Sequence, residues 1–101
     1  MDISDWRKRI DEIDRKLVKL LSERSRCAIE VGTLKRNLNL PVYDPGREEK
    51  IFNKIIANNK GPLKDKALKR LFERIIDESR RVERLEVERE RVTSKKSSSS
   101  T

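Results

Sequence analysis

The 101-residue chain is predicted to be an all-α protein with three helices, one long, one short and one of medium length. Three observations predict this class. Apolar residues recur at helical spacing in three segments, Gly and Pro cluster between those segments, and no segment alternates apolar and polar residues as a half-buried strand does. The clusters at 41–46 and 61–62 divide the chain into segments of about 4–38, 45–59 and 64–92.

The first segment predicts a helix of about 35 residues, which extends roughly 50 Å at 1.5 Å per residue. Ser4 is the expected N-cap, and Asp5 suits the positive end of the helix dipole. Hydrophobic residues make up only 34% of the chain, so a domain of this size cannot bury such a helix in a core of its own. We therefore expect the helix to pack along a second copy of the chain.

The second segment begins with an N-cap signal, because Asp44 precedes a proline at the first helical position. The third segment continues to about Val92 and is followed by a run of Ser, Thr and Lys. Such a composition is typical of a disordered end. We therefore divide the chain into a helical domain, residues 1–92, and a disordered tail, residues 93–101.

The net charge of the chain is +8, from 26 Lys and Arg against 18 Asp and Glu. This surplus favours an anionic partner, which the charge alone leaves open among nucleic acid, a membrane surface and a small anion. The absence of His and the presence of a single Cys exclude His-based catalysis, an intrachain disulfide and a thiolate metal cluster. No apolar run is long enough for a membrane span or a signal peptide, so we expect a cytoplasmic protein.

Two cations interrupt the apolar stripe of the first helix. At about 100° per residue, Arg24 and Lys35 fall at the centre of the stripe and Arg7 falls toward its edge. A single misplaced cation is commonly explained by snorkelling or by an ion pair with a facing acid. Two such cations are harder to explain in this way, because burying an unpaired charge costs several kcal/mol. We infer that an anionic ligand meets them.

The other two helices carry polar residues on their apolar faces as well: Ser79 and Glu83 on the third, and Glu48 on the second. Each has a simpler explanation. The Ser79 hydroxyl can donate a hydrogen bond to a carbonyl one turn earlier, and Glu83 can pair with Arg24. Glu48 can stabilise the first turn of its helix through the helix dipole. Together the positions predict a polar pocket without a nucleophile or metal cluster, where positioning and electrostatics would carry the chemistry. Its residues are Arg7, Arg24, Lys35, Asp44, Arg47, Glu48, Ser79 and Glu83.

The pattern resembles the all-helical class of chorismate mutase. Four segments carry the resemblance: WRKRIDEID at 6–14, LLSERSRCAIEVGTLK at 20–35, PVYDPGREEKI at 41–51 and LFERIIDES at 71–79. It implies an intertwined homodimer of three-helix protomers, with two active sites that are each shared between the chains. It also implies the [3,3] Claisen rearrangement of chorismate to prephenate in phenylalanine and tyrosine biosynthesis, without a cofactor or a covalent intermediate.

The resemblance implies substrate-binding roles for seven of the pocket residues, all except Arg47, and catalytic roles for three of these, Arg24, Lys35 and Glu83. Arg24 and the partner's Arg7 would hold the two carboxylates of the substrate, because guanidinium forks suit carboxylates better than ammonium groups do. Ser79 would help to bind a carboxylate. Glu48 and the backbone at Asp44 would hold the ring hydroxyl.

The resemblance also implies catalytic roles at the ether oxygen of the substrate. Lys35 would donate to this oxygen as negative charge grows on it in the transition state. Glu83 would lie beside the same oxygen, where a carboxyl donates only when it is protonated and an amide donates at any pH. We therefore expect activity to fall as the pH rises through the titration of Glu83, and Glu83→Gln to flatten the profile. Arg47 would shape the local field.

Three other functions stay open from the sequence. A pyruvate-eliminating isochorismate lyase would use a similar helical pocket, and an assay with both substrates separates the two enzymes. A basic helical nucleic-acid-binding dimer would use exposed Arg80, Arg81 and Arg84 on phosphates, although aromatic residues for stacking are scarce. A regulatory or inactive helical dimer would fail to bind a dianionic transition-state analogue.

Overall fold

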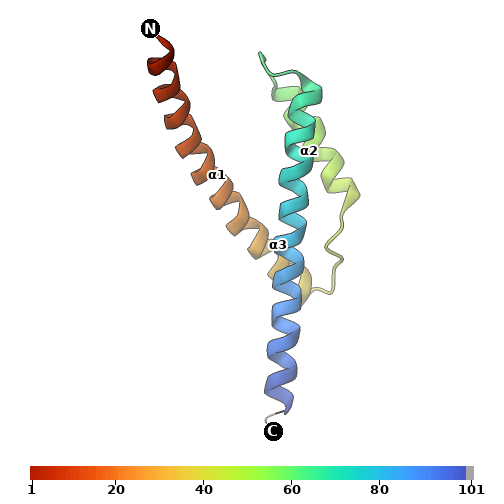
Figure 1. Cartoon of the computed structure of the whole chain (residues 1–101). Helices are drawn as coiled ribbons and strands as arrows, with labels where there is room; N and C mark the ends of the chain where they lie inside the picture. Colours follow the sequence, from red (N-terminus) through yellow and green to blue (C-terminus); the bar gives the residue numbers. More distant parts are fainter. Residues whose placement is uncertain (100–101) are drawn as a thin grey trace.

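The computed structural model describes the backbone of residues 1–99 and the side chains of residues 1–88. Three helices make up this part of the chain: α1 (Ile3–Asn37), α2 (Pro45–Asn58) and α3 (Asp65–Ser99). The C-terminal part of α1 lies against the middle of α3, α2 lies beside the N-terminal half of α3, and the N-terminal half of α1 extends away from both (Figure 1). The predicted all-α class with three helices is confirmed.

The first helix begins before the predicted cap. Asp2, and not Ser4, is the N-cap: its Oδ1 accepts a hydrogen bond from the backbone N–H of Asp5 at 2.9 Å. Oδ2 of Asp5 accepts from the N–H of Asp2 at 3.0 Å. This reciprocal arrangement satisfies two free N–H groups at once, whereas a Ser4 cap would satisfy one. The predicted cap of α2 is confirmed, since Oδ1 of Asp44 accepts from the N–H of Arg47 at 3.1 Å.

The third helix is longer than predicted. α3 contains 35 residues, the same length as α1, so the expectation of a medium helix ending near Val92 is wrong. Residues 93–99, expected to be disordered, continue the helix, and residues 100–101 of the predicted tail lie outside the described residues. No Gly or Pro follows Pro62, and Ser and Thr lower helix propensity by less than about 0.7 kcal/mol each. The sequence therefore contains no residue that breaks the helix there.

The backbones of α1 and α3 come close together at Gly32. A Cβ atom on this glycine would lie 3.0 Å from the Cα atom of Glu83 and 3.1 Å from its carbonyl oxygen. Only glycine therefore lets the two backbones come this close without a shift. Ala28 lies one turn earlier, and together with Ile76 it is one of two buried hydrophobic residues among the described side chains. Small residues on α1 thus set the position of α3.

The N-terminal part of α1 has no core around it. All residues from 1 to 23 are exposed, including apolar side chains such as Ile10 at 54% and Leu17 at 50% exposure. The radius of gyration is 18.4 Å, whereas a compact chain of this length has about 13 Å. The single chain therefore leaves most of the apolar stripe of α1 in contact with solvent. No helix in the described part is both long and apolar enough to cross a membrane.

Candidate active site

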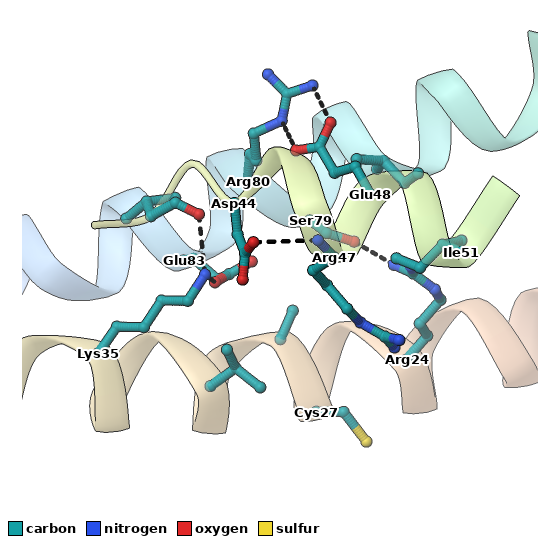
Figure 2. Close-up of a pocket in the computed structure, with 14 residues that line it drawn as sticks. Arg24, Cys27, Lys35, Asp44, Arg47, Glu48, Ile51, Ser79, Arg80 and Glu83 are labelled. Carbon is teal, nitrogen blue, oxygen red and sulfur yellow. Dashed lines mark hydrogen bonds and ion pairs between the residues drawn. The ribbon is translucent and has the colours of Figure 1, made fainter. Parts of the chain in front are cut away.

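A cavity of about 220 Å³ lies between the C-terminal half of α1, the start of α2 and the middle of α3 (Figure 2). The three helices meet here because Gly32 brings α3 close to α1 and the Asp44 cap starts α2 beside the cavity. The cavity is lined by seven of the eight residues that the sequence predicts for a polar pocket. These are Arg24, Lys35, Asp44, Arg47, Glu48, Ser79 and Glu83.

Lys35 and Glu83 form an ion pair at one end of the cavity. Nζ of Lys35 lies 2.9 Å from Oε1 of Glu83 and also donates a hydrogen bond to the carbonyl oxygen of Val42 at 2.9 Å. The side chains are only 15% and 10% exposed. The partner of Glu83 is thus Lys35, and not Arg24 as one explanation from the sequence suggested. The ammonium group is held from two sides, by α3 and by the connection between α1 and α2.

Arg24 and Ser79 meet near the other end. Nη1 of Arg24 donates a hydrogen bond to Oγ of Ser79, and this hydroxyl donates in turn to the carbonyl oxygen of Ile75 at 3.0 Å. The local bond that the sequence suggested for Ser79 is therefore present, and the hydroxyl also orients Arg24. A guanidinium has five N–H donors. Since one is used on Ser79, most of the donors of Arg24 are free for an anion in the cavity.

Arg80 is a residue of the cavity that the sequence predicted to lie on the surface. Its Nε lies 2.9 Å from Oε2 of Glu48, and its Nη2 donates to Oε1 of Glu48 at 3.2 Å. We call this contact the Arg80–Glu48 pair. The expectation that Arg80 is an exposed cation is wrong, because its side chain is only 31% exposed. Its helical angle held the signal: at 100° per residue, Arg80 falls about 40° from Ile76, which is buried.

The lining combines charge with apolar walls. Four cationic and three anionic side chains line the cavity, which leaves one net positive charge, and Val31, Ile51 and Ile76 contribute apolar surface. The guanidinium of Arg47 extends toward α1 on the side of Arg24, whereas the sulfur of Cys27 points away from the polar groups (Figure 2). The arrangement suits a small anionic molecule with an apolar ring, held by several fixed donors and acceptors.

Arg7 is the predicted pocket residue that the structure does not bring to the cavity. It lies on the exposed part of α1, 17 positions before Arg24. A helix rises 1.5 Å per residue, so the two residues are about 25 Å apart along the axis. Arg7 therefore cannot reach the cavity of its own chain.

Comparison with known proteins identifies the family. The profile described as chorismate mutase type II matches residues 6–84. The chain belongs to the chorismate mutase type II family. The matched span contains all eight predicted pocket residues, so the resemblance seen in the sequence is confirmed.

Individual relatives of this chorismate mutase type II chain agree with that result. It is 38% identical over 79 residues to the bifunctional chorismate mutase/prephenate dehydratase of Aquifex aeolicus, a match covering 74% of this chain. It is 43% identical over 53 residues to the chorismate mutase of Methanocaldococcus jannaschii, covering 52% of this chain. The matches span 22% and 54% of those two relatives.

A solved structure gives the same fold over most of the chain. The chorismate mutase of Thermus thermophilus, in form II, superposes with a TM-score of 0.80 at 40% sequence identity. The match covers 81% of this chain and 93% of that one. The three-helix arrangement of the chain is therefore that of a solved chorismate mutase.

Proposed function

We propose that the chain is a chorismate mutase, an isomerase that rearranges chorismate to prephenate in the biosynthesis of aromatic amino acids. The observation that carries the proposal is the convergence of Arg24, Lys35, Glu48, Ser79 and Glu83 on one cavity in a member of this family. These groups come from all three helices. The reaction needs no nucleophile, which agrees with a lining made of fixed charges and hydrogen-bonding groups.

Substrate binding in this proposal depends on the cations of the cavity. Chorismate carries two carboxylates, and the lining has one net positive charge before a second chain adds to it. Arg24 is oriented by Ser79 and can offer two parallel N–H groups to one carboxylate. Clamping the carboxylates holds the flexible enolpyruvyl arm over the ring, so the reacting carbons are positioned before the bond forms.

Lys35 is the proposed transition-state donor. Negative charge grows on the ether oxygen as the C–O bond breaks, and an ammonium already fixed by Glu83 and the Val42 carbonyl meets that charge without reorganising. The interaction is stronger in the transition state than with the substrate, so it raises kcat. In the ion pair Glu83 accepts from Lys35; the protonated carboxyl is the form that would donate to the ether oxygen.

The second half of the proposal is a homodimer in the cytoplasm, with sites shared between the chains. Three observations support it. The N-terminal part of α1 exposes an apolar stripe, Arg7 lies on that part of the helix, and the cavity of one chain is smaller than the roughly 300–1,000 Å³ of most ligand pockets. A second copy packed along α1 would cover the stripe and bring the partner's Arg7 toward the cavity.

The deciding experiment is an assay of the purified protein with chorismate, with prephenate as the measured product. Isochorismate is assayed in parallel for release of pyruvate, and binding to duplex DNA is measured at low and moderate salt. We expect prephenate formation and no salt-dependent DNA binding. Pyruvate release without prephenate would favour the lyase, and DNA binding without either product would favour the nucleic-acid binder. The nucleic-acid hypothesis already has one fewer surface cation, since Arg80 pairs with Glu48.

A further inference from the structure

The Arg80–Glu48 pair is the one strong contact in the cavity to which the proposed function gives no role. It joins α3 to the first turn of α2 through two atoms on each side, with separations of 2.9 Å and 3.2 Å (Figure 2). The Glu48 side chain is 18% exposed and lines the cavity, as does Arg80. The Nη2 contact is a hydrogen bond and the Nε contact is a close ion pair, so the guanidinium holds both oxygens of the carboxylate in place.

Arg80 is itself held in place by two further groups. Its Nη2 also donates to Oδ1 of Asp77 at 3.0 Å, one turn earlier on α3. Its Cζ lies 5.5 Å from the centre of the Tyr43 ring, so the guanidinium has the aromatic contact expected of a cation–π interaction. The cation therefore has few positions available to it, and the carboxylate bound to it is constrained in the same way.

The charge of Glu48 makes such a partner necessary. The ligand proposed for this cavity is a dianion, and a carboxylate in the lining repels it unless a cation compensates. Glu48 is useful only as an acceptor for the neutral ring hydroxyl. Arg80 places the compensating charge at both oxygens of Glu48, and each carboxylate oxygen has a second lone pair that can accept from a further donor.

We propose that Arg80 is a positioning residue that orients and neutralises Glu48, so that this carboxylate can accept the substrate hydroxyl without repelling the substrate. This inference rests on the proposed function. Arg80 would act through Glu48 and would not touch the reacting atoms. The expected signature is an effect on KM that depends on the carboxylate of Glu48.

The test is a double-mutant cycle on chorismate turnover with Arg80→Gln, Glu48→Gln and the double variant. We expect Arg80→Gln to raise KM about tenfold while kcat changes less than about threefold, because Glu48, no longer oriented and neutralised, accepts the substrate hydroxyl less well on binding. In the Glu48→Gln background, the same substitution should raise KM by less than about twofold. Arg80→Lys, which keeps the charge and loses the fork, should give an intermediate KM.

The matched control is Arg74→Gln. Arg74 lies on α3, and its Nη2 is 2.9 Å from Oε1 of Glu78 on the same helix. Its side chain is 76% exposed, so this ion pair lies on the surface. We expect its KM and kcat to be unchanged. Helicity and thermal unfolding are followed for every variant; if Arg80→Gln does not fold, Arg80→Lys replaces it in the cycle. If Glu48→Gln is too slow to assay, binding of a dianionic bicyclic transition-state analogue gives the same cycle.

The outcomes separate the inference from the proposed function. A wild-type protein that forms no prephenate would overturn the proposed function, and the inference with it. An active wild type whose KM is unchanged by Arg80→Gln would overturn the inference alone. So would an equal rise in KM in the presence and absence of the Glu48 carboxylate, because Arg80 would then act independently of Glu48.

Discussion

The C-terminal half of α1 lies against α3 and supplies Arg24 and Lys35 to the cavity, whereas residues 1–23 extend away from α3 and are all exposed (Figure 1). Both halves carry the same type of apolar stripe with cations on or beside it. They differ in what covers that stripe. In the C-terminal half the covering helix belongs to the same chain, and in the N-terminal half we propose that it belongs to a second copy.

The largest effect should come from the C-terminal half of α1, which is covered by α3 of the same chain. Lys35→Ala removes the proposed transition-state donor, and loss of one such donor lowers kcat by about 10²–10³. Steady-state kinetics with chorismate measure it. Circular dichroism and sedimentation serve as controls, since helicity and assembly should not change. Near-normal turnover in a folded Lys35→Ala protein would remove Lys35 from the mechanism.

Mixing two variants tests directly whether the N-terminal half of α1 contributes to the cavity of a second chain. Arg7→Ala and Arg24→Ala should each lower kcat/KM by about 10², because each removes a charge-assisted carboxylate contact worth about 1.5–3 kcal/mol. In a heterodimer of the two variants, one site keeps both arginines. We therefore expect activity to return when the inactive variants are mixed under conditions that allow exchange. Verified heterodimers that stay inactive would show that the sites are not shared.

The crossing point of α1 and α3 can be tested through stability. Gly32→Ala places a Cβ 3.0 Å from the Cα of Glu83, so one backbone must shift, and overpacking of this kind costs about 1–3 kcal/mol. Thermal unfolding measures the change. Gly46→Ala is the matched control, because the new Cβ would have one neighbour at 3.7 Å. Equal melting temperatures for both variants would contradict a close contact at Gly32.

The smallest effect is expected at Glu83, and it is a change in pH dependence. In the proposed mechanism a carboxyl at this position donates to the ether oxygen only when it carries a proton, whereas an amide donates at every pH. Lys35 of α1 faces this carboxyl, and Asp44 and Arg47 line the same cavity. Glu83→Gln donates at every pH, so its profile of kcat against pH should be flatter. A profile of unchanged shape would show that Glu83 does not donate its proton in the reaction.

Helical periodicity predicts the faces of the helices well. Together with the cap signal at Asp44 it identifies seven residues that line the cavity, and the Gly and Pro clusters place the breaks between the helices within about two residues of their observed positions. Angles around a helix decide which side chains point inward. Because these angles depend only on local sequence, they can be predicted without knowing how the helices pack.

Pairing between helices is not predicted in the same way. The angle of a residue around its helix does not give the axial position of that helix relative to its neighbour. This axial position decides whether Glu83 meets Arg24 or Lys35. It depends on the close contact at Gly32, which only the folded structure reveals. The helical angle of Arg80 places it on the inner face, but its pairing with Glu48 on another helix is not given by that angle. The Asp2 cap and the end of α3 depend on local hydrogen bonds and propensities that are too weak to fix a boundary from the sequence.

The hydrogen bond from Lys35 to the carbonyl oxygen of Val42 links the ammonium that we propose for catalysis to the segment that joins α1 to α2. Adding or removing a residue in this linker would slide the carbonyl away from the ammonium, even with every pocket side chain retained. Because every residue carries such a carbonyl, the length of the linker and not the side chain at position 42 decides whether this acceptor is within reach of the lysine. Grafts that exchange this linker should therefore keep its length.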